Sequence, residues 1–306
     1  MKALVFDNYK GKFNLINKYL GIASIKFEIV RFKNGEGKLL IKENVKGEDI
    51  IIFSDFSNSI EYSYLNEKRK YSKDEYYVDL KRAISALDEA KTVSVFLPLI
   101  YESRQNSNNK NESKDYLMFV SDLKNMGVKN IITFEAHGDN KKVTSYSLAS
   151  LFKDKQYDVV VSPDEGGVSR SKEYSKILKC DNCHFSKVRD LTNIVNGSNP
   201  IKEYSHSNYD FTNKSVLIVD DILDSGSTLL KAINEINNAK LIDVFVTYPL
   251  FSNGLKDFKK LVKENKLNKI YVSDLIFLDK LVTECDFIEI IDTNKYISDI
   301  LKEVIK

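Results

Sequence analysis

Short apolar runs rich in β-branched residues recur along the chain, and each is followed by a segment with helical spacing. The runs lie at residues 49–53, 92–97, 130–134, 158–162, 215–219 and 243–247. Continuous rather than alternating apolarity is typical of strands that are covered on both faces. Between them, apolar residues recur at three- and four-residue intervals over 76–90 and 114–126, which predicts helices. The pattern predicts an α/β fold with mainly parallel sheets flanked by helices.

This alternation of strand and helix occurs twice. The first set of strands ends near Phe134, and the second set begins at Val159. At roughly 100–200 residues per domain, the length also suits two domains. We therefore expect two similar domains, residues 1–145 and residues 146–306. The segment 294–306 has the spacing of a terminal helix, which could pack on either domain.

Two long polar segments interrupt the pattern. Residues 61–77 are dense in Tyr, Lys and Glu, and residues 102–115 contain no apolar side chain. A segment without apolar residues has nothing to bury in a core. Each segment therefore predicts an exposed loop, and a mobile lid is the functional alternative.

Charge and composition exclude some function classes. The 306 residues include 46 Lys and Arg against 44 Asp and Glu, which leaves a formal net charge of +2. Such a chain has no cationic field, so we expect no nucleic-acid and no membrane partner. Asp7 interrupts the N-terminal apolar run, and no later stretch approaches the roughly 18 apolar residues of a membrane span. We expect a globular, cytoplasmic protein.

The cysteines are few. Cys180, Cys183 and Cys285 cannot all pair within one chain, which fits a reducing compartment. Cys180 and Cys183 form a C-x-x-C pair that could belong to a zinc or redox site. No second pair follows at zinc-finger spacing, so the alternative is a coincidence of spacing.

The segment 216–229 carries the most chemical information. An apolar run delivers Asp220 and Asp221, and a turn of small residues then opens a helical pattern. The turn consists of Asp224, Ser225, Gly226, Ser227 and Thr228. Backbone N–H groups at a helix start, Ser and Thr hydroxyls and a close glycine backbone bind phosphate. The two carboxylates would repel a phosphate but suit sugar hydroxyls or a hydrated metal ion. The segment predicts a sugar-phosphate site.

The same segment carries a family resemblance. The run VDDILDSGST resembles the ribose-5-phosphate loop of type I phosphoribosyltransferases, and most of the chain resembles ribose-phosphate pyrophosphokinase, also called phosphoribosyl-pyrophosphate synthetase. Five further segments stand in the family's order: FKNGE at 32–36 for F-S-D-G-E, SRQ at 103–105 for A-R-Q-D, FEAH at 134–137 for T-L-D-L-H, SPDEGG at 162–167 for S-P-D-x-G-G, and KVR at 187–189 for K-R-R.

The resemblance implies two phosphoribosyltransferase-type domains and a Mg²⁺-dependent reaction. The β,γ-diphosphate of ATP would move to the anomeric hydroxyl of ribose 5-phosphate, and AMP would leave. Charge neutralisation and positioning do most of the work in such a transfer. His137 and Asp164, each following a predicted strand, would hold Mg²⁺. Lys187 and Arg189 would stabilise charge around the transferred group.

The resemblance also implies an ATP site. Arg104 and Gln105 would contact ATP. Phe32, Asn34 and Glu36 would reach the adenine of a neighbouring subunit's ATP, which implies a homo-oligomer built from dimers. Asn34 stands where the family generally has Asp, so an acceptor is kept but a charge is lost. Adenine selectivity could therefore be looser than in the family.

Other departures leave alternatives open. The insertion-like stretch 61–77 and the Asn-rich run 106–110 resemble a divergent Firmicute-type branch. One alternative keeps the chemistry with ADP-ribose as acceptor, as understood for phage-type relatives that rebuild NAD⁺. Another is a catalytically silent regulatory member of the family, although retention of His137, Asp164, Lys187 and Arg189 argues against it. A plain phosphoribosyltransferase would need one domain only.

Overall fold

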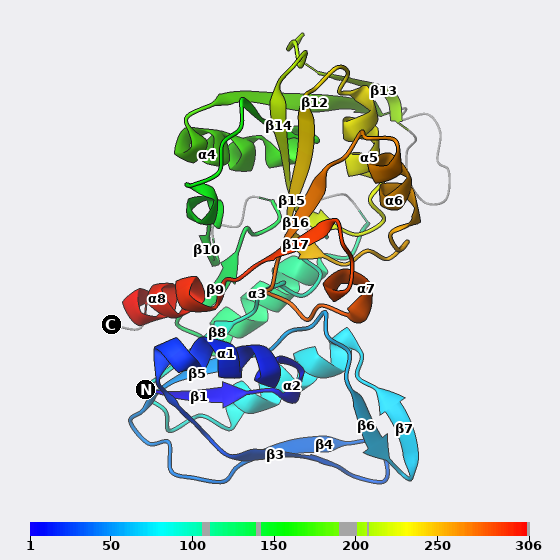
Figure 1. The fold of residues 1–306 in the computed structure, drawn as a ribbon. Helices are drawn as coiled ribbons and strands as arrows, with labels where there is room; N and C mark the ends of the chain where they lie inside the picture. The colour runs from blue at the N-terminus through cyan, green and yellow to red at the C-terminus, as the bar shows by residue number, and fades with distance from the viewer. Residues whose placement is uncertain (106–110, 139–141, 190–200, 207, 305–306) are drawn as a thin grey trace. The chain divides into compact units, whose positions relative to one another are not determined.

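The computed structural model describes residues 1–105, 111–138, 142–189, 201–206 and 208–304, with backbone alone at 187–189 and 201–206. The chain forms two compact units. The first comprises Met1–Tyr146, Leu275–Phe277 and Asp292–Lys306, and the second comprises Ser147–Asp274 and Leu278–Ile291. The polypeptide therefore passes from one unit to the other more than once, and both of its ends belong to the first unit (Figure 1).

The first unit is built on a parallel sheet of six strands in the order β10-β9-β8-β5-β1-β2. Their bounds are β1 Lys2–Val5, β2 Ala23–Ser24, β5 Asp49–Phe53, β8 Thr92–Phe96, β9 Ile131–Phe134 and β10 Thr144–Tyr146. The central strand β5 is apolar on both faces. Ile50 and Ile52 belong to a buried hydrophobic cluster that also contains side chains of residues 76–87 and 116–123. On the opposite face of the strand, the Phe53 ring lies 4.9 Å from the Phe13 ring. Burial on both faces explains its unbroken apolar run.

Helices cover this sheet. They are α1 Lys10–Leu20, preceded by the short η1 Asp7–Tyr9, α2 Lys73–Ser85, α3 Asp115–Asn125 and α8 Asn294–Val304. The terminal helix α8 packs along α1, and Lys12 Nζ donates to Thr293 Oγ1 over 3.2 Å. Helix α2 begins where Ser72 and Glu75 form a reciprocal capping box. It therefore starts ahead of the predicted segment 76–90, and it ends at Ser85, before the end of that segment.

Two antiparallel hairpins complete the first unit, β3 Phe27–Arg31 with β4 Gly37–Ile41, and β6 Glu61–Tyr64 with β7 Glu67–Lys70. The second hairpin corrects the prediction of a loop over 61–77. Tyr62 and Tyr64 alternate with exposed residues along β6 and are half-buried. This period of two was hidden by the high polarity of the segment.

The second unit holds a sheet of seven strands in the order β13-β12-β11-β14-β15-β16-β17. All neighbours are parallel except β12 and β13 at one edge. The strands are β11 Val159–Ser162, β12 Asp181–Arg189, β13 Ile201–His206, β14 Ser215–Leu223, β15 Leu241–Pro249, β16 Lys269–Ser273 and β17 Ile288–Ile291. Two mainly parallel sheets with flanking helices confirm the predicted α/β fold.

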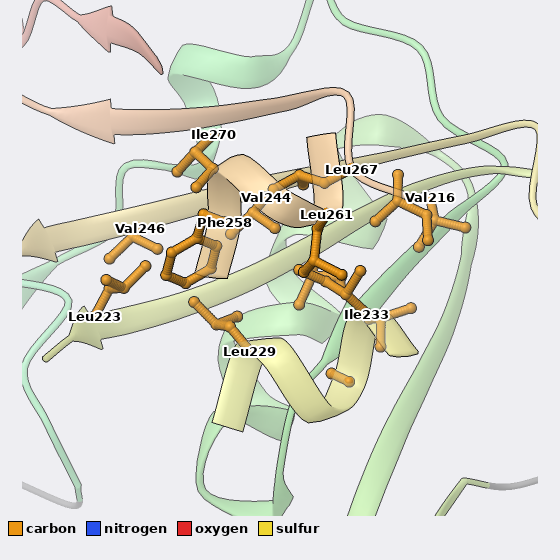
Figure 2. Close-up of a cluster of buried hydrophobic side chains, with 14 of the residues drawn as sticks. Val216, Leu223, Leu229, Ile233, Val244, Val246, Phe258, Leu261, Leu267 and Ile270 are labelled. Carbon is orange, nitrogen blue, oxygen red and sulfur yellow. The ribbon is translucent and has the colours of Figure 1, made fainter. Parts of the chain in front are cut away.

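Helices flank this sheet on both sides, with α4 on one and α5 and α6 on the other (Figure 1). The helical elements are η2 Ala149–Phe152, η3 Glu165–Gly167, α4 Val168–Leu178, α5 Ser227–Glu235, α6 Lys256–Lys263 and α7 Lys280–Thr283. Figure 2 shows Leu229 and Ile233 of α5 and Phe258 of α6 pointing into one buried cluster with the strand residues Val244 and Val246. This cluster anchors the start of α5.

Among the described residues, no helix is both long enough and apolar enough to cross a lipid bilayer. The three cysteines are free thiols. Cys183 is buried in the core of the second unit, and Cys180 is half-buried just after α4.

Candidate active site

Two carboxylates stand on strand β14 of the second unit. The strand extends to Leu223, beyond the predicted run 215–219, so Asp220 and Asp221 lie within it rather than after it. Neighbouring β15 continues the pairing through Leu223 and Pro249. Asp221 is buried, and the Asp220 side chain retains 15% of its exposure. The two acids are therefore held by backbone pairing on a rigid element.

An arginine from α4 binds both carboxylates. Arg170 Nη2 donates to Asp221 Oδ2 over 2.7 Å, and Arg170 Nη1 lies 3.7 Å from Asp220 Oδ1. Only 9% of the arginine side chain is exposed. Burial, then the adjacent Asp221 charge, raises the pKa of Asp220, and Arg170 opposes this rise. The positive charge of the guanidinium thus reduces the repulsion that the two carboxylates would exert on an anion bound nearby.

The close approach of α4 depends on Gly167, directly before the helix. A Cβ at this position would lie 2.5 Å from Ser162 Oγ and 3.3 Å from Arg170 Nη1. The S-P-D-E-G-G segment therefore does more than provide Asp164. It also lets Arg170 reach the acids on β14.

The small-residue loop joins β14 to α5. Gly226 takes a left-handed conformation with φ of 80° and caps the helix that begins at Ser227. A Cβ there would lie 2.8 Å from the Phe258 ring, which Figure 2 places in the core below α5. Ser225 and Ser227 are exposed, with their hydroxyl oxygens 3.3 Å apart. The backbone needs glycine here for its conformation and for contact with the core.

A second loop supports the first from the end of β15. The Ser252 hydroxyl donates to the Asp224 carboxylate, and Ser252 N–H donates to the Asp224 carbonyl over 3.0 Å. The Asn253 amide donates to the Ser225 carbonyl over 3.4 Å. Asp224 is thus fixed at side chain and backbone and Ser225 at its backbone carbonyl. A loop that is already ordered loses less conformational entropy when a ligand binds.

The two predicted metal ligands belong to different units. Asp164 in the second unit is half-exposed, accepts from Gly166 N–H over 3.1 Å, and raises the pKa of Asp220 as a minor cause after burial. His137 in the first unit is half-exposed and lies three residues after β9.

The predicted ATP residues belong to the first unit. Phe32, Asn34 and Glu36 form the exposed tip between β3 and β4. Arg104 and Gln105 are exposed in the turn that follows β8, where Gln105 Nε2 donates to Glu102 Oε2 over 3.1 Å.

Lys187 and Arg189 lie at the end of β12, opposite Tyr204 and Ile201 of β13. Their side chains lie outside the described residues, so the structure gives only the backbone of these two predicted catalytic residues.

Three residues of this region were not predicted from the sequence: Arg170, Ser252 and Asn253. Arg170 had a signal in hindsight, because it stands one helical turn after Gly167 beside two acids on the adjacent strand. Together the acids, the arginine and the braced loop can bind a molecule with neighbouring hydroxyls and a phosphate.

Comparisons with known proteins place both units in one family. Residues 4–127 match the N-terminal domain of ribose phosphate pyrophosphokinase, and residues 137–253 match the phosphoribosyl transferase domain. The chain belongs to the ribose-phosphate pyrophosphokinase family. It is an enzyme of that family, as predicted from its motifs.

Curated ribose-phosphate pyrophosphokinases resemble the chain over nearly its whole length. The protein of Burkholderia pseudomallei (strain K96243) is 27% identical over 286 residues, which are 88% of this chain and 83% of that protein. The Bacillus caldolyticus protein is 24% identical, with 86% and 82% covered. Phosphoribosylpyrophosphate synthetase from Mycobacterium smegmatis has the same fold at 18% identity, with a TM-score of 0.76 and 99% of this chain covered.

Proposed function

We propose that this protein transfers the β,γ-diphosphate of ATP to the anomeric hydroxyl of ribose 5-phosphate, forming phosphoribosyl pyrophosphate and AMP. The observation that carries the proposal is the pair Asp220 and Asp221, held by Arg170 and followed directly by the braced loop 224–228. Sugar hydroxyls and a terminal phosphate are the two parts of a sugar phosphate, and this segment offers a partner for each. The predicted division into two phosphoribosyltransferase-like domains at residue 145 is part of the proposal.

The acceptor would bind with its phosphate against the exposed Ser225 and Ser227 and the first N–H groups of α5. Asp220 and Asp221 would accept hydrogen bonds from the ribose hydroxyls. Arg170 offsets part of their charge, which reduces repulsion of the phosphate a few residues away.

The donor would bind to the first unit. Arg104 and Gln105 would contact ATP, and the tip formed by Phe32, Asn34 and Glu36 would contact the adenine of a neighbouring subunit. This arrangement requires a homo-oligomer built from dimers. The Asn34 side-chain oxygen accepts from Glu36 N–H over 3.2 Å. Asn34 would therefore stabilise the tip as well as present its side-chain amide to the adenine.

The transfer forms one phosphorus–oxygen bond and breaks another. The anomeric oxygen of the acceptor attacks the β-phosphorus and releases its proton to solvent, while the oxygen between the α- and β-phosphorus leaves with AMP. Lys187, as a point charge, and Arg189, as a planar fork, would stabilise the negative charge on the transferred group. Their place at the end of one strand would bring both to the same phosphate.

The donor atoms available fit magnesium. In the described parts of the chain, no cluster of three or more His, Cys, Asp and Glu gathers as a protein cage for a metal ion. Mg²⁺ is usually held by one or two side chains, waters and substrate phosphates, so a half-exposed Asp164 together with His137 suits it. When bound, Mg²⁺ would neutralise charge on the phosphates of ATP.

Product analysis tests the proposal. The protein is incubated with ATP, Mg²⁺ and either ribose 5-phosphate or ADP-ribose, and nucleotides and sugar diphosphates are separated by chromatography. We expect AMP and phosphoribosyl pyrophosphate in equal amounts, and loss of turnover with EDTA. A higher kcat/KM for ADP-ribose than for ribose 5-phosphate would identify ADP-ribose as the acceptor. No AMP with either acceptor would indicate a silent regulatory member.

A further inference from the structure

The β6–β7 hairpin contacts the exposed tip of the β3–β4 hairpin through one tyrosine. The Tyr64 hydroxyl lies 2.9 Å from the Phe32 carbonyl oxygen and 3.0 Å from the Lys33 carbonyl oxygen. A phenol has a single O–H hydrogen, which is therefore shared between the two acceptors. Arg69 lies over the Tyr64 ring at 4.7 Å and holds it from the neighbouring strand.

The tip is a tight turn whose shape depends on one of these carbonyl groups, that of Phe32. Gly35 N–H donates to the Phe32 carbonyl over 2.9 Å, and Phe32 N–H donates to the Glu36 carbonyl over 2.7 Å. Gly35 has a φ of 91°, a conformation that suits glycine. Since Phe32 O accepts from both Gly35 and Tyr64, the tyrosine fixes the turn from outside.

The hairpin that carries Tyr64 is itself anchored on α2. The Tyr62 hydroxyl donates to Glu75 Oε1 over 2.8 Å, and the rings of Tyr62 and Tyr71 lie 4.6 Å apart. Tyr71 stacks on Tyr76 at 4.7 Å in turn. A rigid helix therefore sets the position of the Tyr64 hydroxyl.

The base of the tip is anchored on the same helix. Arg31, the last residue of β3, donates to the fully buried Asp79 of α2, with Nη1 3.0 Å from Oδ1. Arg82 Nη1 donates to the same oxygen over 2.7 Å. A cavity of about 820 Å³ is lined by Lys33, Tyr62 and Tyr64 together with residues of β1, α1 and β2. The tip is thus held on α2 both through Arg31 at its base and through the hairpin that carries Tyr64.

We propose that Tyr64 is a positioning residue for the nucleotide base, acting through the 32–36 tip. This inference rests on the proposed function, in which the tip contacts the adenine of ATP. A tip fixed in advance costs less entropy when the base binds, so its loss raises the KM for ATP rather than lowering kcat. The cation Lys38 near the Phe32 ring, at 5.6 Å, would move with the tip.

The test compares Tyr64→Phe with Tyr62→Phe. Both changes remove one hydroxyl from the same strand, but the Tyr62 hydroxyl bonds to α2 and not to the tip. We expect Tyr64→Phe to raise the KM for ATP about threefold to tenfold, since a net hydrogen bond of about 0.5–1.5 kcal/mol is lost. The kcat, the KM for ribose 5-phosphate and the melting temperature should stay near wild type, and the preference for ATP over GTP should fall. Tyr62→Phe keeps the ring that packs on Tyr71 and thus much of the hairpin's anchor on α2, so it should raise the KM for ATP less than Tyr64→Phe does.

Hydrogen exchange provides a readout independent of turnover. The amides of Phe32 and Gly35 should exchange faster in Tyr64→Phe than in Tyr62→Phe, because the tip opens more often. An unchanged KM for ATP, or equal effects of both variants, would overturn the inference. If the wild type forms no AMP, the proposed function fails, and ATP affinity measured by calorimetry on the same variants still decides whether Tyr64 positions a nucleotide-binding tip.

Discussion

Arg170 and Asp221 form a buried ion pair of 2.7 Å between α4 and β14. The arginine side chain is 9% exposed and the aspartate side chain 6%. Asp220 lies within 3.7 Å of the same guanidinium. One cation therefore balances two carboxylates in a place that water barely reaches, and the pair connects the S-P-D-E-G-G segment with the sugar-phosphate loop.

Arg170→Met should destabilise the second unit and impair acceptor binding. Removing one partner of a buried pair leaves an uncompensated charge, which costs about 3–5 kcal/mol in free energy of unfolding. Chemical denaturation measures this cost, and Asp221→Asn in the same background should recover part of it. Wild-type stability in Arg170→Met would contradict the burial of the pair.

The same variant gives a pH dependence with a defined sign. Without Arg170, burial and then the charge of Asp221 keep the folded-state pKa of Asp220 above the unfolded value. The deficit in stability relative to wild type should then be full at high pH and shrink as pH falls through the raised folded pKa. It should be smallest below the unfolded value of about 4. Denaturation at several pH values measures the trend; a deficit that grows as pH falls would count against it.

Lys187→Ala should remove turnover while sparing folding. If Lys187 acts on charge that develops during transfer, kcat falls by about 100-fold or more and the KM values change little. Lys176→Ala, an exposed lysine on α4, is the matched control. Steady-state kinetics measures both. Equal kcat values for the two variants would assign Lys187 to the solvated surface.

Gly226→Ala should lower stability before it affects binding. The new Cβ would meet the Phe258 ring at 2.8 Å on a backbone with φ of 80°, and the left-handed conformation alone costs about 1–2 kcal/mol. Gly11→Ala on the exposed side of α1 has nothing within 4 Å and should be neutral or slightly stabilising, because alanine favours a helix more than glycine does. Melting temperatures compare the two, and Phe258→Leu should relieve part of the Gly226→Ala loss. Ser225→Ala is the cleaner probe of phosphate binding, because its side chain is exposed.

Cys180 should react slowly with alkylating reagents. Burial, then the charge of Asp181, raises the pKa of its thiol to about 11. A higher pKa means less thiolate at pH 8, so iodoacetamide should modify Cys180 about 100-fold more slowly than an unperturbed thiol with a pKa of about 8.5. Peptide mass spectrometry after timed alkylation measures this rate, with the unfolded protein as reference. Rapid alkylation in the folded state would reopen a redox role for the C-x-x-C pair.

Local sequence patterns predicted the strands and turns whose formation depends on residues close together in the sequence. The run 49–53 matches β5 in full, because both faces of that strand are covered and the four apolar positions 50–53 are all buried. The turn at Gly226 was also predicted, since the need for a small residue at a helix start is local.

Features that depend on distant partners were missed. Arg170 pairs with an acid 51 positions later, and only the parallel pairing of β11 with β14 brings the two together. The sequence pattern predicts a loop where β6 lies, because the Tyr64 hydroxyl bonds to Phe32 and Lys33 rather than to residues of its own segment. Polar side chains that satisfy one another across the fold leave no periodic apolar signal.

The location of α8 in the first unit has a consequence for the order of events during synthesis. Helix α8 packs along α1, yet residues 147–274 and 278–291, which form the second unit, are made between them. A nascent chain that ends near residue 146 lacks the cover that α8 gives to α1, including the contact of Tyr296 with Phe134 at 6.1 Å between ring centroids. The ribosome must therefore synthesise the whole second unit before α8 is available to complete the first unit. The two units consequently cannot complete their folding in simple N-to-C order as the chain emerges.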